Sequence, residues 1–581
     1  MPFFDTLKKH VLIIVPVIVF AAWIGFLLIN SLGASRRVTF YDALHQVDVS
    51  GQYSSEVPLE RYLLEPFVGF AFTLATEIQD SMLLLLVVYV VIRFVFALLE
   101  KVILRGNAKK EILVHYARKV GNFYWKYAFF AFIVVFLCII AGISLDGFLF
   151  MHQEFMSYLQ AGLISWLILL AAKIIQNMII FFKKDARLRI KPRKWWLSLP
   201  RNKFRFWHHK TWDFIGREIR YGLTFLMIYA AISLNLMSTY LPPQVIKETT
   251  PLQPGEMLMD FHCHTRLSDG FLTPEDRVNW YIGQGLQGAA ITDHENVNGG
   301  LEAAAYVASH HLNFTVIVGQ EYTKYNPRIH LNVFGINQTI PTDELLGGNT
   351  SASALPPMNV STMIHYVKTH GGYVVVNHYG YDNVPYSLEQ LRLWSVDGFE
   401  IVNGGGVKDD RIRQFCLNNS LICLATSDEA SSVSLTAFTR FKLANPLNRS
   451  IDAIFAALKN YSTTQCIAVK EQQNRIDWPR ALNDFSPLRD FIVYLRSIDA
   501  WQSFSWMAWS CGFFALYLVA LFWIKKHVNA QEQNAKIIED PRKRSFMFAH
   551  RGITIGAVIA GIVIFLLLAQ FLISSVLPSF A

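Results

Sequence analysis

Long apolar runs occur in several parts of the chain. They form seven blocks, at 11–30, 81–99, 129–151, 158–182, 221–240, 503–524 and 553–576. A run of about 20 apolar residues is what a helix needs to cross the hydrocarbon core of a bilayer. Most of the blocks are apolar on every face, whereas a helix on the surface of a globular domain has one polar face. The pattern therefore predicts an α-helical transmembrane bundle of about seven spans.

A different pattern begins at Met257. Short runs rich in Val, Ile and Phe alternate with amphipathic stretches, as in MLMDFHCH, PEDRVNWYIGQG, GAAITDH, GLEAAAYVASH and FTVIVGQEYT. Alternation of strands and helices predicts a parallel sheet covered by helices, either open or closed into a barrel. We therefore expect a mixed fold with three domains: a membrane domain with five spans at 1–250, an α/β domain at 251–480, and a membrane region with two spans at 481–581.

Basic residues are concentrated in three of the segments between the apolar blocks. Lys and Arg number seven in 100–127, thirteen in 183–220 and seven in 525–551, against three in 31–80. Because short cytoplasmic loops are enriched in Lys and Arg, this distribution predicts a cytoplasmic N-terminus and an extracytoplasmic α/β domain. We expect an integral membrane protein, with the bacterial inner membrane as its location.

The net charge of +9 could reflect binding either to nucleic acid or to anionic lipids. The mixture of basic and aromatic residues within 183–212 is also found in nucleic-acid-binding segments. Contact with anionic lipid headgroups is the more economical explanation, since Trp and Tyr gather at the membrane interface. We therefore expect the lipid bilayer as a partner and no nucleic acid. The six cysteines form no CxxC pair, and a bridge between Cys416 and Cys423 is allowed but not required.

Residues that bind metals stand where the predicted strands of the α/β domain end. The segment 259–270 reads MDFHCHTRLSDG, in which His262 and His264 project to the same side of a strand because they are two residues apart. In α/β barrels the functional groups lie at the C-terminal ends of the strands. Further residues of this kind are Asp293, His294, Glu321, His378, Glu400 and Asp428. This pattern predicts a cluster of metal ions.

The order D-x-H-x-H-T, SDG, ITDH, E, H, NH and SD resembles the PHP (polymerase and histidinol phosphatase) family over about residues 257–468. The stretch LSDGFLTPEDRVNWYIGQGLQGAAITDHENVNG is particularly similar to the branch of that family that hydrolyses carbamates and phosphoesters. The resemblance implies a distorted seven-stranded β/α barrel that holds two or three divalent metal ions. It also implies a set of ligands, position by position.

By this resemblance, the first metal is held by His262, His264, Glu321 and Asp428, which also form the expected catalytic set. Glu321 bridges to a second metal held by His330 and His378, and Asp269 with His294 corresponds to two ligands of a third. The chain reads Asp428-Glu429-Ala430 where the family usually has Asp-x-His, so the third metal lacks a ligand.

Other positions near the ligands have less certain roles. His378 is followed by Tyr379 where the family usually has proline. Glu400 either replaces a histidine ligand or lies behind the ligands. Asp260 and Asp293 are expected to orient imidazoles rather than to bind metal.

Mixed imidazole and carboxylate ligands favour Zn²⁺, Mn²⁺ or Fe²⁺. A bridged pair of such ions generates hydroxide near neutral pH and holds both oxygens of an in-line phosphoryl displacement. We therefore expect a membrane-anchored, metal-dependent phosphoesterase whose substrate is an extracytoplasmic phosphoester, plausibly lipid-linked. The expected contacts to the substrate phosphate are Arg266, Lys324 and Arg328, followed by Lys408 and Arg411.

Three alternatives stay open at this point. The fold could hydrolyse carbamates or other esters, or it could be a metal- or phosphate-binding sensor without turnover, as Ala430 would allow. Arg93 and Lys173 lie in apolar blocks and leave transport as a minor alternative. The identity of the metal, the substrate and the oligomeric state are not determined by these patterns.

Overall fold

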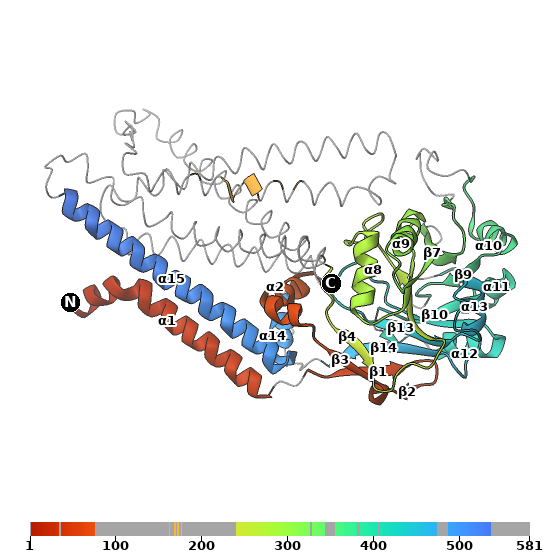
Figure 1. Cartoon of the computed structure of the whole chain (residues 1–581), viewed down its shortest axis with the longest axis horizontal. Coiled ribbons are helices and arrows are strands. Elements are labelled where there is room, and N and C mark those ends of the chain that lie inside the picture. The colour runs from red at the N-terminus through yellow and green to blue at the C-terminus, as the bar shows by residue number, and fades with distance from the viewer. Residues whose placement is uncertain are drawn as a thin grey trace, which may run out of the picture.

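The computed structural model describes residues 2–33, 36–75, 240–325, 328–342, 355–379, 384–404, 406–407, 410–472 and 486–535, with a few single residues between 162 and 176. Two long helices, α1 (Pro2–Gly33) and α15 (Ala500–Ala535), lie side by side at one end of Figure 1. An α/β domain occupies the other end. Helices α2 (Leu59–Ala75) and α14 (Ser486–Ser497) lie between them.

The α/β domain is built around a barrel of seven strands. In order around the sheet they are β5 (Glu256–Cys263), β6 (Gly288–Ile291), β7 (Thr315–Tyr325), β8 (Arg328–Phe334), β9 (Tyr373–Val376), β10 (Gly398–Asn403) and β12 (Ile422–Thr426). Neighbouring strands are parallel, except that β8 is antiparallel to both β7 and β9. The last strand joins the first, because Asp428 N donates to His262 O at 3.0 Å and His264 N donates to Glu429 O at 3.1 Å. The expected α/β domain is therefore confirmed, as a barrel.

Among the described residues, six helices cover the outside of this barrel. They are α8 (Pro274–Gly283), α9 (Asn298–Ser309), α10 (Val360–Thr369), α11 (Leu388–Leu393), α12 (Asp410–Asn419) and α13 (Ile451–Leu458). Several begin at a side chain that accepts a hydrogen bond from the first turn, such as Thr273 for α8 and Ser450 for α13. Their apolar faces pack on buried Val, Ile and Phe residues of the strands.

The sheet continues beyond the barrel into the N-terminal part of the chain. From β5 it runs through β13 (Ala437–Lys442) and β14 (Gln465–Glu471) to β1 (Val38–Asp42) and β2 (Val47–Asp48). Phe40 and Leu44 are buried in the cores of the α/β domain. After η1 (Ser50–Gln52), β3 (Tyr53–Glu56) pairs with β4 (Val245–Glu248), and β11 (Gly406–Val407) pairs with β10. Residues 38–56 thus belong to the α/β domain, although the sequence placed them with the first membrane domain.

The predicted transmembrane bundle is contradicted by the structure. In the described part of the chain, none of the helices has the length and apolar character that a membrane crossing requires. The predicted integral membrane location, with the α/β domain on the extracytoplasmic side, depended on the same spans and is contradicted with them. Blocks 11–30 and 503–524 lie in α1 and α15. The other five blocks lie outside the described residues, apart from single positions in 158–182 and Tyr240.

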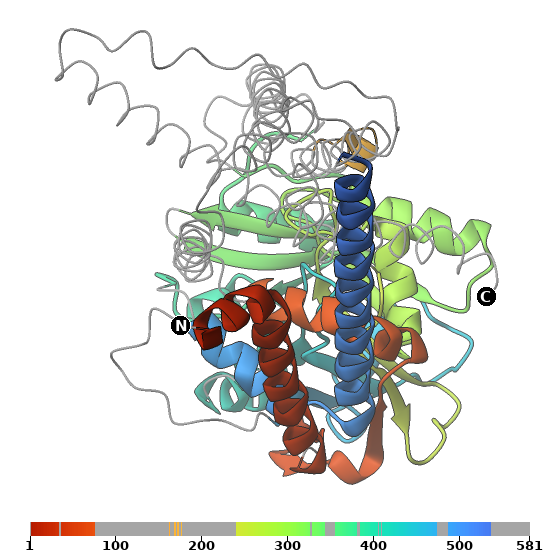
Figure 2. The same cartoon turned by 90° about the vertical axis from the view of Figure 1, so that its left-hand side faces the viewer.

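Packing between α1 and α15 explains part of the apolar character that suggested lipid contact (Figure 2). The rings of Phe20 and Phe514 stack at 4.1 Å, and Trp23 meets Trp506 edge-on at 6.0 Å. Leu27 is fully buried in the same cluster. An apolar run indicates that a helix is buried. Packing against a second helix and burial in lipid both favour apolar residues, so the sequence pattern does not distinguish them.

Candidate metal centre

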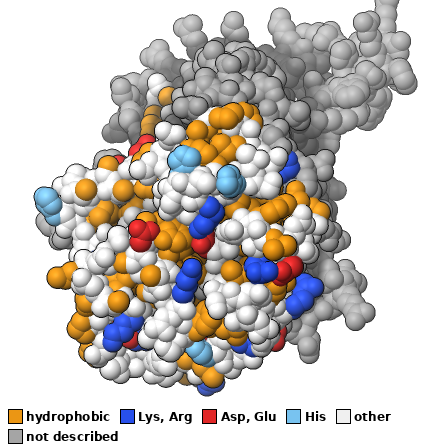
Figure 3. Space-filling model, turned by 90° about the vertical axis from the view of Figure 1, so that its right-hand side faces the viewer, with side chains coloured by type: hydrophobic (Ala, Val, Ile, Leu, Met, Phe, Trp, Pro, Cys, Tyr) orange, Lys and Arg blue, Asp and Glu red, His pale blue; other side chains and the backbone are white. Residues whose placement is uncertain are grey.

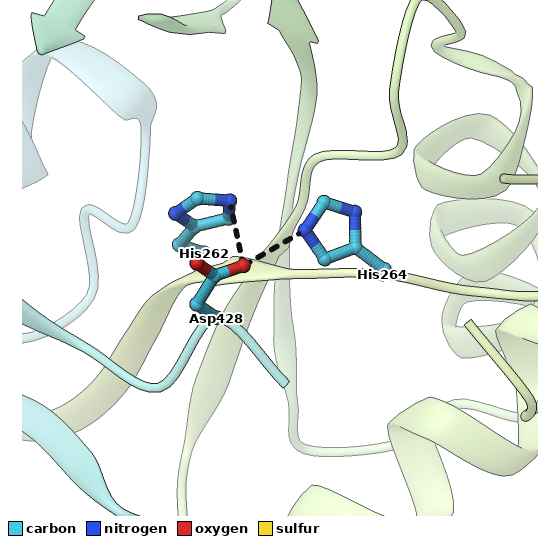
Figure 4. Close-up of side chains that lie close together, drawn as sticks. All are labelled: His262, His264 and Asp428. Carbon is cyan, nitrogen blue, oxygen red and sulfur yellow. Dashed lines mark hydrogen bonds and ion pairs between the residues drawn. The ribbon is translucent and has the colours of Figure 1, made fainter. Parts of the chain in front are cut away.

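The site begins with a histidine of β5, a second histidine directly after β5, and an aspartate after β12. Strand alternation places His262 and His264 on the same side of β5, as expected from their spacing. Both imidazoles point to one carboxylate oxygen of Asp428 (Figure 4). His262 Nε2 lies 3.3 Å and His264 Nε2 lies 3.1 Å from Asp428 Oδ1. These three side chains form a group that could hold a metal ion.

Glu321, on β7, lies at the centre of the site. Its Oε2 atom is 3.3 Å from His262 Nε2, 3.5 Å from His264 Nε2 and 3.1 Å from His294 Nδ1. Its Oε1 atom is 3.0 Å from His330 Nδ1 and 3.5 Å from His378 Nε2. Glu321 therefore belongs to two further groups able to hold a metal, one with His264 and His294 and one with His330 and His378.

Asp269 is the outermost of the predicted ligands. Its side chain is 52% exposed, and its carboxylate oxygens lie 3.5 Å from His264 Nδ1 and 3.6 Å from His294 Nε2. It adjoins the three groups without being part of them. The structure thus brings all eight residues predicted as metal ligands into one continuous site at one end of the barrel, where the parallel strands end and the antiparallel β8 begins.

Opposite charges hold the site in a strongly ionised state. Burial favours a neutral Glu321, but His294 and His262 keep its pKa well below the usual range. The pKa of Asp428 is likewise lowered, against burial, by His262 and His264. Burial also opposes protonation of His262, yet Asp428, Glu321 and Glu400 raise its pKa well above 6.5. In the metal-free protein a protonated His262 therefore balances part of the charge of these carboxylates.

One buried nitrogen in particular fits a cation. His262 Nε2 is buried and has no hydrogen-bond partner in the described chain, although Glu321 Oε2 and Asp428 Oδ1 both lie 3.3 Å away. A ring nitrogen and two carboxylate oxygens that converge at this spacing suit a shared cation. The mixed nitrogen and oxygen donors fit Zn²⁺, Mn²⁺ or Fe²⁺ better than Ca²⁺.

Asp260 and Asp293 act on the backbone around the site rather than on imidazoles. Asp260 Oδ1 accepts from His262 N at 3.2 Å and Ser427 N at 3.1 Å, and so joins β5 to the segment that carries Asp428. Asp293 accepts from the amide of Thr265 at 2.6 Å and the hydroxyl of Ser268 at 2.7 Å. Burial raises the pKa of Asp260 to about 6. Neither residue belongs to a metal-binding group among the described residues.

Several residues that support the site were not identified from the sequence. Arg277, fully buried on α8, donates to the carbonyl of His264 at 3.1 Å and to that of Ser431 at 2.9 Å. Asn377 donates to Glu321 Oε1 at 2.9 Å. Asn377 stands in the motif VVVNH beside a predicted ligand, which is the only signal that the sequence offers for it.

The predicted phosphate contacts differ in their surroundings. Burial raises the pKa values of Asp276 and Glu302, and the nearby Arg266 offsets part of that rise. Strand alternation places Lys324 on the face of β7 opposite Glu321, but places Arg328 on the same face of β8 as His330.

Arg328 and Arg411 are exposed, whereas Lys408 lies outside the described residues. On the face of the domain in Figure 3, the Lys and Arg side chains stand apart from one another, with acidic and uncharged side chains between them. Of the three main candidates, only Arg328 is both exposed and on a face that carries a predicted ligand.

Comparisons with known proteins agree with this fold. The sequence profile of the PHP domain family matches residues 260–462. No curated protein sequence matches the chain. Among solved structures, a two-domain protein from Bacteroides vulgatus, described as containing a predicted PHP-like metal-dependent phosphoesterase, is 21% identical with a TM-score of 0.31. The match covers 37% of this chain and 66% of that protein, so this chain spans just under two thirds of its length.

Two further solved structures are similar to part of this chain. A protein from Bifidobacterium adolescentis, provisionally named a metal-dependent phosphoesterase, is 19% identical with a TM-score of 0.25, over 34% of this chain and 95% of its own. An amidohydrolase from Chromobacterium violaceum is 16% identical with a TM-score of 0.23, over 30% of this chain and 87% of its own. The profile match and the barrel with its clustered histidines lead to one conclusion: residues 260–462 form a PHP domain.

Proposed function

We propose that this chain is a metal-dependent hydrolase of phosphoesters. The observation that supports the proposal best is Glu321, whose two oxygens lie between imidazoles from β5, β8 and the segments that follow β6 and β9. A buried carboxylate in this position suits a bridge between two cations. We assign His262, His264, Glu321 and Asp428 to one cation, and Glu321, His330 and His378 to a second.

The protein residues would prepare the site for this chemistry. Bound divalent cations would lower the pKa of water and neutralise charge on the phosphoryl oxygens. Glu321 is fixed by Asn377, so its two oxygens hold separate positions. Substrate would approach from the side of Asp269 and Asp428, whose side chains are 52% and 28% exposed while Glu321 is buried. Arg328 is our candidate for contact with the phosphate.

A third cation would rest on Asp269 and His294, and we expect it to bind more weakly than the first two. The family pattern has a histidine where this chain has Ala430, and the carbonyl of Ala430 instead accepts a bond from Phe271 N at 2.8 Å. The same observation favours the second candidate function, a metal- or phosphate-binding sensor without turnover. The expectation of a lipid-linked substrate stays a prediction, tested by rates on matched soluble and lipid-tethered phosphoesters.

The test uses the full chain loaded with Mn²⁺ or Zn²⁺ and a panel of aryl phosphates, phosphodiesters and carbamates. We expect hydrolysis of a phosphoester, and loss of both bound metal and hydrolysis in Glu321→Ala. The control is Glu389→Ala on α11, an exposed glutamate paired with Arg392. Hydrolysis of carbamates alone would favour the related ester chemistry. Metal binding without any hydrolysis would support the sensor, and a chain that binds no metal would refute both.

A further inference from the structure

We propose that β10 positions the metal ligands through Glu400 and Asn403 without supplying a ligand itself, an inference that rests on the proposed function. The other six barrel strands carry, or lead directly into, a residue of the metal-binding groups. Strand β10 contributes none among the described residues. It nevertheless places two polar side chains, both buried, in the middle of the site.

Glu400 is fully occupied by donors from the protein. Its Oε1 atom accepts from His262 Nδ1 at 2.7 Å and from the Thr426 hydroxyl at 2.8 Å. Its Oε2 atom accepts from the His378 amide at 2.8 Å and from Asn403 Nδ2 at 3.0 Å. A carboxylate has about four acceptor sites, so this set leaves none for a cation.

The contact with His262 determines which ring nitrogen faces the metals. A carboxylate only accepts, so Nδ1 of His262 keeps its proton when a cation displaces the proton from Nε2. The lone pair of Nε2 is then directed at the gap between Glu321 and Asp428, where both carboxylate oxygens are 3.3 Å away. Glu400 thus acts on the metal through the orientation of His262.

Asn403 extends this control to Asp428. Its Nδ2 atom donates to Asp428 Oδ2 at 3.0 Å, which leaves Oδ1 toward His262 and His264. Asp428 and His378 both have positive φ angles, 53° and 24°. A non-glycine residue in this region is strained and persists only where its surroundings hold it there. Strand β10 bonds to both residues and so stabilises both conformations.

A bulge in β10 explains how Glu400 and Asn403 reach the same side. Residues three apart on a regular strand face opposite sides. The pairing of β10 with β12 shifts register between Glu400 and Val402, so Ile401 is an extra residue. Ile401 and Val402 both pack in the outer core, and the alternation resumes with Asn403 facing inward. The bulge is therefore the backbone feature that brings both positioning residues together.

The test compares Glu400→Gln and Asn403→Ala with the wild type and with the control Glu389→Gln, all as full chains. Mn²⁺ affinity and the number of ions bound at saturation are measured by equilibrium dialysis with elemental analysis. Thermal unfolding of the metal-free proteins shows whether each variant folds. We expect both site variants to bind as many ions as the wild type, with affinity lower by about 10–100-fold, and the control to be unchanged.

The outcomes separate this inference from the proposed function. Wild-type affinity in both site variants would overturn it. Loss of one whole ion in Glu400→Gln would also overturn it, because Glu400 would then be a ligand. If Glu400→Gln does not fold, the Mn²⁺ affinity and the number of bound ions in Asn403→Ala decide whether the positioning role holds. A wild-type chain that binds no Mn²⁺ or Zn²⁺ would refute the proposed function, and the positioning role would fall with it.

Discussion

Leu44 offers a direct test of how closely the N-terminal segment is built into the PHP domain. It lies in the turn between β1 and β2, about two hundred residues before the domain that the sequence delimits, yet it is 2% exposed. It belongs to the same core cluster as Ile412 of α12 and Ala425 of β12. We expect Leu44→Ala to destabilise the PHP domain.

The expected size follows from burial. Removing a fully buried leucine side chain loses its transfer free energy and leaves a cavity, for a total of about 2–5 kcal/mol. Leu44 lies in a turn that can partly collapse, so we expect about 3 kcal/mol, toward the lower end. A change of this size raises the unfolding equilibrium constant roughly 100-fold, because about 1.4 kcal/mol corresponds to a factor of ten.

Hydrogen exchange measured by mass spectrometry on the full chain reports this change within the domain. Peptides from β14 and β12 should exchange faster in Leu44→Ala than in the wild type. Leu447→Ala is the matched control, since Leu447 is 93% exposed on the same domain and its truncation should have little effect. Equal protection of β14 and β12 in the two variants would show that residues 38–48 only lie against the domain, and the reasoning would be refuted.

Two further predictions concern the site. In the metal-free protein, neighbouring carboxylates raise the pKa of His262 well above 6.5 and that of His294 to about 10, against the effect of burial. Mn²⁺ must displace those protons, so its affinity in equilibrium dialysis should rise between about pH 6 and pH 8, and a flat profile would contradict this. Gly299→Ala would place a Cβ 1.9 Å from Asp293 Oδ2, and chemical denaturation should show a loss of about 1–3 kcal/mol. Gly51 has open space around it, so Gly51→Ala should leave the free energy of unfolding unchanged. If Gly299→Ala and Gly51→Ala proved equally stable, the prediction for Gly299 would be wrong.

Local sequence patterns predicted the sheet and its covering helices because these elements are close in sequence, but they left open whether the sheet closes into a barrel. The strands that lead to His294, His378 and Asp428 were recognisable, whereas β8 with His330 was not. The spacing of His262 and His264 correctly placed both on one side. The addition of β1 to β14 was not predictable in this way. Val38 pairs with Glu471, and no local pattern records a partner so far along the chain.

Two features of the site also lay beyond sequence patterns. The inward position of Asn403 depends on the bulge at Ile401, which no residue type there announces. The role of Asp260 depends on Ser427, a contact between β5 and the end of β12 that forms only when the barrel closes. The apolar blocks 11–30 and 503–524 were misleading for a related reason, since hydropathy measures the need for burial and does not identify the partner.

The pairing of β1 with β14 has a consequence for synthesis on the ribosome. The N-terminal strand emerges first, but its partner is 433 residues further along, as the pair Val38 and Glu471 shows. At about 5–20 residues per second, roughly 20–90 seconds pass before β14 appears. During that time the edge of β1 is open to wrong strand partners. Nascent chains of this protein should therefore depend on chaperone protection until β14 has been translated, slightly more than four fifths of the way along the 581 residues.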